Sequence, residues 1–171
     1  KQIHIICPSL WLASCARKSL LMKNWPIHVI PNSIDTNIWY PQEKIYARKK
    51  LGLSIDKSIL FMNGTLGLQD LRKGGDLLLK TLKILSENYS NDNFHEIELI
   101  ALGQNKYKKF SDLNIPIHFF SFTKDTNLIR LLYAASDIVV IPSRQDNLPC
   151  VAQEAFACSR PIVAFDYSGL S

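Results

Sequence analysis

The segment LIRLLYAASDIVVIPSRQDNLPCVAQEAFACSRPIVAF, residues 128–165, alternates between two kinds of apolar pattern. NLIRLLYAAS (127–136) is typical of a helix and DIVVIPS (137–143) of a short strand. After a further helix, RPIVAFDYSG (160–169) is again typical of a strand. Short strands rich in Ile and Val that alternate with helices predict βαβ units and a parallel sheet. The fold class is therefore predicted to be α/β.

The same alternation extends over the rest of the 171-residue chain. A charged helix at 43–52 is expected to stop at Gly52. Parallel sheets bind ligands beyond the carboxyl ends of their strands, so we expect a functional site in the loops there. The other predicted strands are 3–9, 27–33, 58–64, 95–103 and 115–122, and the other predicted helices are 11–23 and 75–89.

The composition is that of an ordinary globular protein, with 47% hydrophobic and 20% charged residues. No apolar run approaches the roughly 18 residues that cross a membrane, so we expect a cytoplasmic protein. Residues 1–50 hold eight Lys or Arg against two acidic residues, whereas residues 51–171 hold twelve against thirteen. This uneven charge argues against nucleic acid as a partner. The basic segment suits the inner face of the cell membrane or a phosphorylated ligand, although a solvated surface is the commoner cause.

The cysteines and histidines form no recognisable metal or disulfide pattern. The cysteines are separated by 7, 134 and 7 residues, which fits neither a zinc site nor a disulfide framework. We interpret them as reduced thiols that fill small gaps in the core. No two histidines have metal-ligand spacing, so no metal is expected. These residues are Cys7, Cys15, Cys150, Cys158, His4, His28, His95 and His118.

The loop at 63–75 holds four of the chain's seven glycines and two adjacent cations. A glycine-bearing loop that opens a helix beside cations is suited to binding a phosphate group. The pattern is neither GxxxxGK[ST] nor GxGxxG, so an exposed helix start is an equal alternative. The residues are Gly64, Gly67, Gly74, Gly75, Arg72 and Lys73.

The loop after DIVVIPS is a second candidate anion site. Asn147 is expected to cap the following helix, and Pro149 is tolerated in its first turn. The backbone N–H groups of Leu148, Cys150 and Val151 would then be unpaired and directed outward.

Glu154 lies in the middle of the apolar face of that helix. An ionised carboxylate is costly there unless a partner satisfies it. The partner is either a hydroxyl group of a ligand or the guanidinium of Arg160 or Arg144, and residue spacing does not decide between them.

Four motifs occur in order over nearly the whole chain: VIPNSID (29–35), RKGGDLLLKTL (72–82), LIRLLYAASDIVVIPS (128–143) and SRQDNLPCVAQEAFACSRPIVAF (143–165). Together they resemble the donor-binding half of GT-B glycosyltransferases, in the retaining family-4 group, also called glycosyl transferases group 1. The resemblance implies a Rossmann-like parallel sheet with helices on both faces, as in the C-terminal half of a GT-B fold. It also implies transfer of a sugar from a nucleotide-diphosphate donor to a growing glycan with retention, in surface polysaccharide or lipopolysaccharide biosynthesis.

The resemblance also implies roles for single residues. Arg72 and Lys73 would neutralise the donor diphosphate and stabilise the charge that builds on it, so that neither a metal nor another cofactor is needed. Asp146 would contact hydroxyls of the transferred sugar, and Glu154 would accept hydrogen bonds from the ribose. The other donor-binding residues implied are Gly64, Phe122, Thr123, Asn147, Leu148, Pro149 and Cys150.

Three positions depart from the family pattern. The first acidic residue of the pair is Asp146 in place of glutamate, as in a sub-branch with the QDNLP wording. The arginine usual after the strand glycine is Thr65, which shifts the cationic role to Arg72. The glycine of the turn after the helix is Ser159, so the backbone conformation there needs testing.

The resemblance suggests a domain arrangement. Residues 1–26 are similar to the end of an N-terminal acceptor domain, and residues 27–171 to a donor-binding domain truncated at its C-terminus. Such a fragment is expected to be inactive alone, because the acceptor domain would exclude water and place the acceptor. The expected partners are a nucleotide sugar, such as a UDP- or GDP-sugar, and a glycan or lipid-linked acceptor.

Other classes of function stay open. One is a non-catalytic nucleotide-sugar-binding module that works with a separate acceptor-binding subunit. Another is a GT-B-fold epimerase or phosphorylase, which the PNSID and QDNLP segments disfavour. A dinucleotide oxidoreductase is least favoured, because the sequence lacks the glycine fingerprint and its acidic ribose residue.

Overall fold

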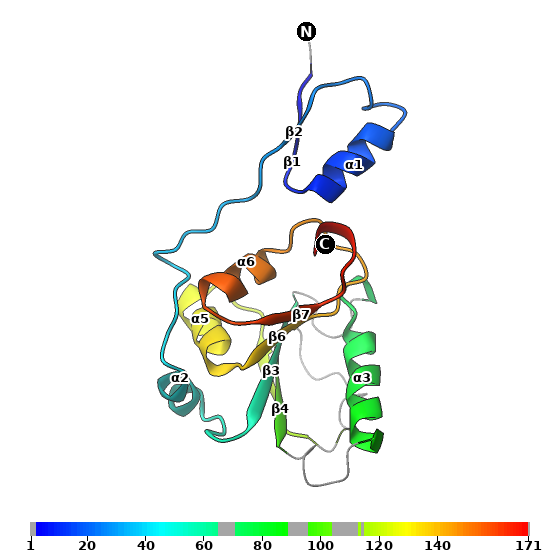
Figure 1. Ribbon diagram of the computed structural model, residues 1–171. Coiled ribbons are helices and arrows are strands. Elements are labelled where there is room, and N and C mark those ends of the chain that lie inside the picture. The colour runs from blue at the N-terminus through cyan, green and yellow to red at the C-terminus, as the bar shows by residue number, and fades with distance from the viewer. Residues whose placement is uncertain (1–2, 65–70, 89–95, 104–112, 114, 171) are drawn as a thin grey trace.

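The strands form two separate parallel sheets, one in a small N-terminal unit and one in a larger unit (Figure 1). The computed structural model describes residues 3–64, 71–88, 96–103, 113 and 115–170. In the small unit, β1 (Ile5–Cys7) pairs with β2 (Ile27–Val29). In the larger unit the strand order is β5-β4-β3-β6-β7. Its strands are β3 (Ser58–Asn63), β4 (Ile97–Gly103), β5 (Ile117–Ser121), β6 (Ile138–Ile141) and β7 (Ile162–Ala164).

The helices of the larger unit cover both faces of its sheet (Figure 1). Alternate residues of a strand point to opposite faces, and β3 shows this clearly. Ile59 and Phe61 pack in one buried cluster with α2, α5 and α6, whereas Met62 packs in another with α3. The predicted α/β class, with helices on both faces of a parallel sheet, is confirmed. The helices are α2 (Lys44–Leu51), α3 (Gly75–Asn88), α5 (Thr126–Ala135) and α6 (Cys150–Ala157), with 3-10 turns η2 (Leu71–Lys73) and η4 (Ser168–Leu170).

Every predicted strand and helix is present, and most are shorter than their apolar patterns. Gly52 ends α2 as expected, with φ of 67° and its N–H directed to the Arg48 and Lys49 carbonyls. The helix predicted at 11–23 stops early, because α1 (Leu10–Lys18) is followed by Ser19 in an extended conformation. Residues 20–24 form turns, so apolar content there did not indicate helix.

The small unit is a single β1–α1–β2 crossover with its own buried cluster of Cys7, Ala13 and Ala16. The hydroxyl of Ser9 caps α1 by accepting the Leu12 N–H at 3.1 Å. β2 belongs to this unit, because it pairs along its whole length with β1. The paired strands also bring His4 against His28, with Nδ1 and Nε2 3.0 Å apart, a contact that sequence spacing did not reveal.

The four cysteines divide into two kinds. Cys7 and Cys158 are buried, as the interpretation of core-filling thiols requires. That interpretation is wrong for Cys15 and Cys150, which are exposed. Cys15 lies between the buried Ala13 and Ala16 of α1 without joining their face, and Cys150 is the first residue of α6.

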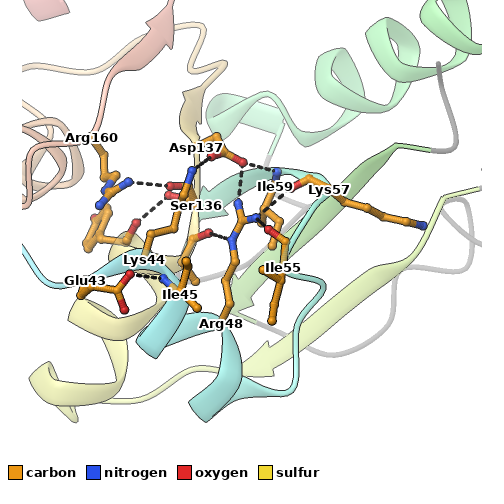
Figure 2. A network of polar contacts seen from close by, with 12 residues as sticks. Glu43, Lys44, Ile45, Arg48, Ile55, Lys57, Ile59, Ser136, Asp137 and Arg160 are labelled. Carbon is orange, nitrogen blue, oxygen red and sulfur yellow. Dashed lines mark hydrogen bonds and ion pairs between the residues drawn. The ribbon is translucent and has the colours of Figure 1, made fainter.

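A buried arginine links α2 to the start of the central strands (Figure 2). Arg48 is 1% exposed, and its guanidinium donates to the carbonyls of Ala135, Ile55 and Lys57 and, at 2.6 Å, to the Asp137 carboxylate. That carboxylate also accepts the Ile59 N–H at 2.7 Å. Burial alone would raise the pKa of Asp137, but the hydrogen bonds from Ile59, Lys44 and Arg48 and the charge of Arg48 outweigh it and lower the pKa. Asp137 is therefore ionised at neutral pH.

We expect Asp137→Ala to destabilise the chain by about 3–5 kcal/mol, because it leaves the buried guanidinium of Arg48 without its counter-ion. Lys44→Ala is the matched control, since Lys44 contacts the same carboxylate at 3.0 Å from an exposed position. Its cost should stay below about 1 kcal/mol. Urea unfolding followed by circular dichroism measures both values, and equal costs would contradict the assigned importance of Arg48.

Candidate functional site

A cavity of about 190 Å³ opens at the carboxyl edge of the five-stranded sheet. Its wall comes from the ends of β3 and β4, the segment after β5, the turn η2, and helices α5 and α6. We call it the carboxyl-edge pocket, and it lies where the parallel sheet predicted a site. Its lining residues are Asn63, Gly64, Lys73, Leu102, Phe122, Thr123, Ile129, Val151 and Glu154.

The pocket gathers residues that are far apart in the sequence. Five of the predicted site residues line it: Gly64, Lys73, Phe122, Thr123 and Glu154. Asp146 adjoins it through an ion pair with Lys73. The other predicted residues lie outside its lining, and these are Arg72, Asn147, Leu148, Pro149 and Cys150.

Glu154 has a neutral partner. Its Oε2 accepts a hydrogen bond of 2.7 Å from the hydroxyl of Tyr133 on α5. The ion pair considered from the sequence is wrong, because Arg160 donates to the Ser136 carbonyl and Arg144 pairs with another carboxylate. Burial raises the pKa of Glu154 above its ordinary 4.5, and the hydrogen bond from Tyr133 lowers it by less. The pocket therefore holds a partly buried acid that no cation neutralises within the described chain.

Asp146 has the opposite environment. Its Oδ2 lies 2.5 Å from Lys73 Nζ and 4.0 Å from Arg72 Nη1. Its Oδ1 accepts the backbone N–H of Asn147 at 3.0 Å. The carboxylate side chain is only 14% exposed, so these contacts hold it in one orientation. One acid of the site is ion-paired, and the other is not.

The turn that carries Arg72 is held against the end of β6. Gly74 has φ of 72°, and a Cβ there would lie 1.8 Å from the Pro142 carbonyl oxygen, so only glycine fits. Arg144 donates its backbone N–H to the Arg72 carbonyl at 2.9 Å, and its guanidinium makes two bonds of 2.7 and 2.6 Å to Asp76. The RKGG stretch is thus a helix start, as one interpretation held, and also supplies a cation to the pocket wall.

Asn147 does not cap α6, which corrects the prediction. The N-cap is Pro149, and no side chain caps the first N–H groups of the helix. Because α6 begins at Cys150, Asn147 lies too far upstream, and its Oδ1 instead accepts a 2.6 Å bond from Ser9 Oγ. This bond joins the small unit to the larger one.

Leu148 faces a second cavity, of about 500 Å³, between the small unit and η4, which we call the interunit cavity. In the wall of this cavity, Gly169 donates its N–H to the Asp146 carbonyl at 2.9 Å. A Cβ at Gly169 would lie 1.2 Å from the Asn147 carbonyl oxygen. The other residues that line the interunit cavity are Pro8, Ser9, Leu10, Trp11, Ser14, Val29, Pro31, Ser168 and Gly169.

Ser159 adopts the backbone conformation that the family's glycine would favour. Its φ is 56°, and the Arg160 N–H reaches back to the Ala155 carbonyl at 2.8 Å. This 6→1 bond is that of a Schellman motif, in which the residue after the helix is left-handed. The replacement of glycine by serine therefore preserves the turn, at a cost of about 1 kcal/mol.

Sequence reasoning missed Tyr133 and Asn63. Tyr133 looked like one more apolar residue of the run LLYAA, and its hydroxyl was the available indication of a buried polar partner. Asn63 lies at the end of β3, within the candidate loop at 63–75, where the sequence singles out only the glycines and cations. Thr65 and Gly67, which the sequence singled out, lie outside the described residues, as does His95.

The larger unit matches a known protein family. The model of the family described as glycosyl transferases group 1 matches residues 44–171. The chain belongs to this family. The resemblance of the sequence motifs to glycosyl transferases group 1 is confirmed.

Individual relatives of this chain are longer proteins. A D-inositol 3-phosphate glycosyltransferase from Xylanimonas cellulosilytica is 29% identical over 161 residues, covering 84% of this chain and 36% of the relative. WaaG, a glycosyltransferase involved in lipopolysaccharide biosynthesis, superposes with a TM-score of 0.79 at 22% identity, covering 97% of this chain and 45% of WaaG. HepE from Anabaena, solved in complex with UDP-glucose, gives 0.71 at 20% identity, with coverage of 96% and 45%. The chain thus spans under half the length of these proteins, and the structures show that its fold matches GT-B glycosyltransferases.

We expect Glu154→Gln to stabilise the chain at pH 7 by roughly 0.5–2 kcal/mol, because it removes a partly buried charge. Because the pKa of Glu154 is raised in the folded state, ionisation of this carboxyl lowers the free energy of unfolding. The loss begins as pH rises above 4.5 and is complete above the folded-state pKa. The gain should therefore vanish below pH 4.5, where Glu154 is protonated in both states. Urea unfolding between pH 4 and 8 tests this, and a gain that does not depend on pH would contradict it.

Proposed function

We propose that this chain is the donor-binding part of a retaining glycosyltransferase that transfers a sugar from a nucleotide-diphosphate donor to a growing glycan. The observation that carries the proposal is the meeting of Lys73, Thr123 and Glu154 in one pocket at the carboxyl edge of the sheet. Membership of glycosyl transferases group 1 supports it. HepE was solved with UDP-glucose and WaaG takes part in lipopolysaccharide biosynthesis, which supports a nucleotide-sugar donor and a surface-polysaccharide or lipopolysaccharide product.

The proposed roles follow from the charges around the pocket. Lys73 and Arg72 bind the diphosphate and stabilise the negative charge that the leaving group gains as the glycosidic bond breaks. Glu154 accepts hydrogen bonds from the ribose, because it is an acid with no cationic partner in the described chain. Asp146 contacts the transferred sugar. Because two cationic side chains serve the diphosphate, we propose that donor binding needs no metal.

Donor binding and the release of Asp146 are coupled in this proposal. Lys73 Nζ lies 2.5 Å from the Asp146 carboxylate. A diphosphate that takes this ammonium group competes directly with the carboxylate. Asp146 then exchanges a cation for the hydroxyl groups of the sugar, so that the carboxylate becomes available only when a donor is bound.

We also propose that the small unit is the end of an acceptor-binding domain, within residues 1–26 and extended by β2. β2 pairs with β1, and the Ser9–Asn147 hydrogen bond brings this unit to the loop that holds Asp146. The interunit cavity lies between the two units, which is where an acceptor for a sugar held near Asp146 would enter. We expect residues 1–171 by themselves to show no transfer activity, because an acceptor-binding domain is needed to place the acceptor.

Nucleosides and nucleoside diphosphates separate the proposed roles of Glu154 and Lys73. Glu154→Ala should weaken binding of both uridine and UDP by about tenfold or more, because both carry the ribose. Lys73→Ala should weaken UDP and leave uridine unchanged, because only UDP carries phosphates. Isothermal titration calorimetry with EDTA present measures both, with guanosine and GDP as the parallel pair.

The control is Glu87→Ala, which removes an exposed carboxylate from α3. It should bind like the unaltered chain. Equal weakening of uridine and UDP by Lys73→Ala would contradict its contact with the diphosphate, and a loss of binding in EDTA would contradict metal independence.

We propose that the small unit also contacts the membrane that carries a lipid-linked acceptor. No helix in the described ranges is long and apolar enough to cross a membrane. The turn after α1 instead exposes Leu20 by 85% and Leu21 by 79%, and Lys18 and Lys23 lie beside them. The first 34 residues contain no acidic residue. Apolar side chains among cations are suited to an anionic lipid surface.

The double change Leu20→Glu with Leu21→Glu should abolish co-sedimentation of the chain with vesicles of phosphatidylglycerol and phosphatidylcholine. Each change removes an insertable side chain and adds repulsion from the anionic surface. Ile84→Glu is the control, because Ile84 is an exposed apolar residue on α3 that directly follows Lys83 and lies four residues after Lys80. Binding that survives the double change, or that Ile84→Glu removes as well, would reject this surface.

A further inference from the structure

Tyr133 is a buried tyrosine whose hydroxyl reaches the carboxyl-edge pocket through Glu154. It is 0% exposed. Its ring makes edge-to-face contacts with Phe61, at 5.0 Å between centroids, and with Trp39, at 5.9 Å. Aromatic packing of this kind fixes both side-chain torsions. The position of the hydroxyl is therefore set by the core and not by the pocket.

The hydroxyl of Tyr133 has one proton to donate and three neighbours. Glu154 Oε2 is 2.7 Å away, whereas the Val151 carbonyl and the side-chain nitrogen of Asn63 are both 3.4 Å away. The short distance and the negative charge assign the proton to Glu154. Asn63 Nδ2 then donates weakly to the tyrosine oxygen, which orients the hydroxyl further.

We infer that Tyr133 is a positioning residue that turns Glu154 so that one carboxylate oxygen is held by the core and the other faces the ligand. Oε2 is bonded to Tyr133, and Oε1 accepts no hydrogen bond from any described residue, while Glu154 lines the pocket. This inference rests on the proposed function, because the ligand groups that Oε1 would accept from are the ribose hydroxyls.

A neutral donor suits this task better than a cation. An arginine in place of Tyr133 would neutralise the carboxylate and occupy both oxygens in bidentate fashion. Tyr133 fixes the direction of Glu154 and leaves its charge intact. The orientation of the carboxylate and its affinity for hydroxyl groups are then set by different contacts.

The two buried groups beside Glu154, Tyr133 and Cys158, both have raised pKa values, so the titration of Glu154 can be followed separately. Burial, and then the charge of Glu154, raises the pKa of Tyr133 well above 10.0. Cys158, four residues after Glu154 at the end of α6, has its pKa raised to about 11 by burial. Lys73, across the pocket, is paired with Asp146. A change in the pH profile after substitution of Tyr133 therefore reports on Glu154.

The test is Tyr133→Phe, which keeps the ring and removes only the hydroxyl. Carbon-13 NMR of the Glu154 carboxyl should show a higher pKa in Tyr133→Phe than in the unaltered chain, because a hydrogen bond to the ionised form is lost. Uridine binding at pH 7 should fall by about 3- to 10-fold, and on acidification it should be lost at a higher pH. In a Glu154→Gln background the same change should cost less than about twofold, since the charged partner is already absent.

Tyr40→Phe is the matched control. Tyr40 is a partly exposed tyrosine whose ring stacks on Arg130, and its loss of a hydroxyl should change neither the pKa of Glu154 nor uridine binding. An unchanged Glu154 pKa in Tyr133→Phe would overturn the inference whatever the chain binds. If the pKa rises but neither uridine nor guanosine binds the unaltered chain, the proposed function fails and the ligand-directed role of Tyr133 fails with it. A full loss of uridine binding in the Glu154→Gln background as well would show a general structural effect and would also overturn it.

Discussion

The buried ion pair between Arg48 and Asp137 is the contact on which the arrangement of the larger unit depends. It joins α2 to the segment that precedes β6, while Asp137 exchanges backbone and side-chain bonds with Ile59 of β3. The relative register of β3 and β6 is therefore set at their amino ends. Those strands end at Asn63 and Ile141, so the same register decides which residues meet at the carboxyl edge. Removing one partner of such a pair is costly, because it leaves the other charge buried without compensation.

The two acids of the site have different surroundings. The Asp146 carboxylate forms an ion pair with Lys73, whereas Glu154 accepts a hydrogen bond from a neutral hydroxyl that the core holds in place. A second anion could compete with the Asp146 carboxylate for Lys73. Glu154 loses hydration on burial, and a further hydrogen bond from a hydroxyl group would offset part of that cost. Both acids come from a stretch of nine residues, and their difference arises from elements that are remote in the sequence.

The sequence predicted the class of fold because strand and helix periodicities depend on local residues, as in DIVVIPS and LIRLLYAAS. It also predicted the pocket's location and Lys73 and Glu154 within it, through the order of the motifs. It could not predict Tyr133 as the partner of Glu154, since the choice among Arg144, Arg160 and Tyr133 depends on how α5 packs beside α6. Asn147 was misassigned as a helix cap because its bond to Ser9 spans 138 positions. The periodicity of apolar residues indicates which face of a helix or strand is buried. Which side chains of different helices and strands contact each other is known only from the tertiary structure.

The close approach of Gly169 to the Asn147 carbonyl has a consequence for engineering. Position 169 is 23 residues from Asp146 and looks like an ordinary turn glycine. Any side chain there would nevertheless collide with the backbone of Asn147, in the loop that holds Asp146. A combinatorial library that varies η4 to reshape the interunit cavity would thus also displace the loop that holds Asp146 and Asn147. Designers who wish to reshape the interunit cavity alone should leave Gly169 unchanged and diversify the wall supplied by α1.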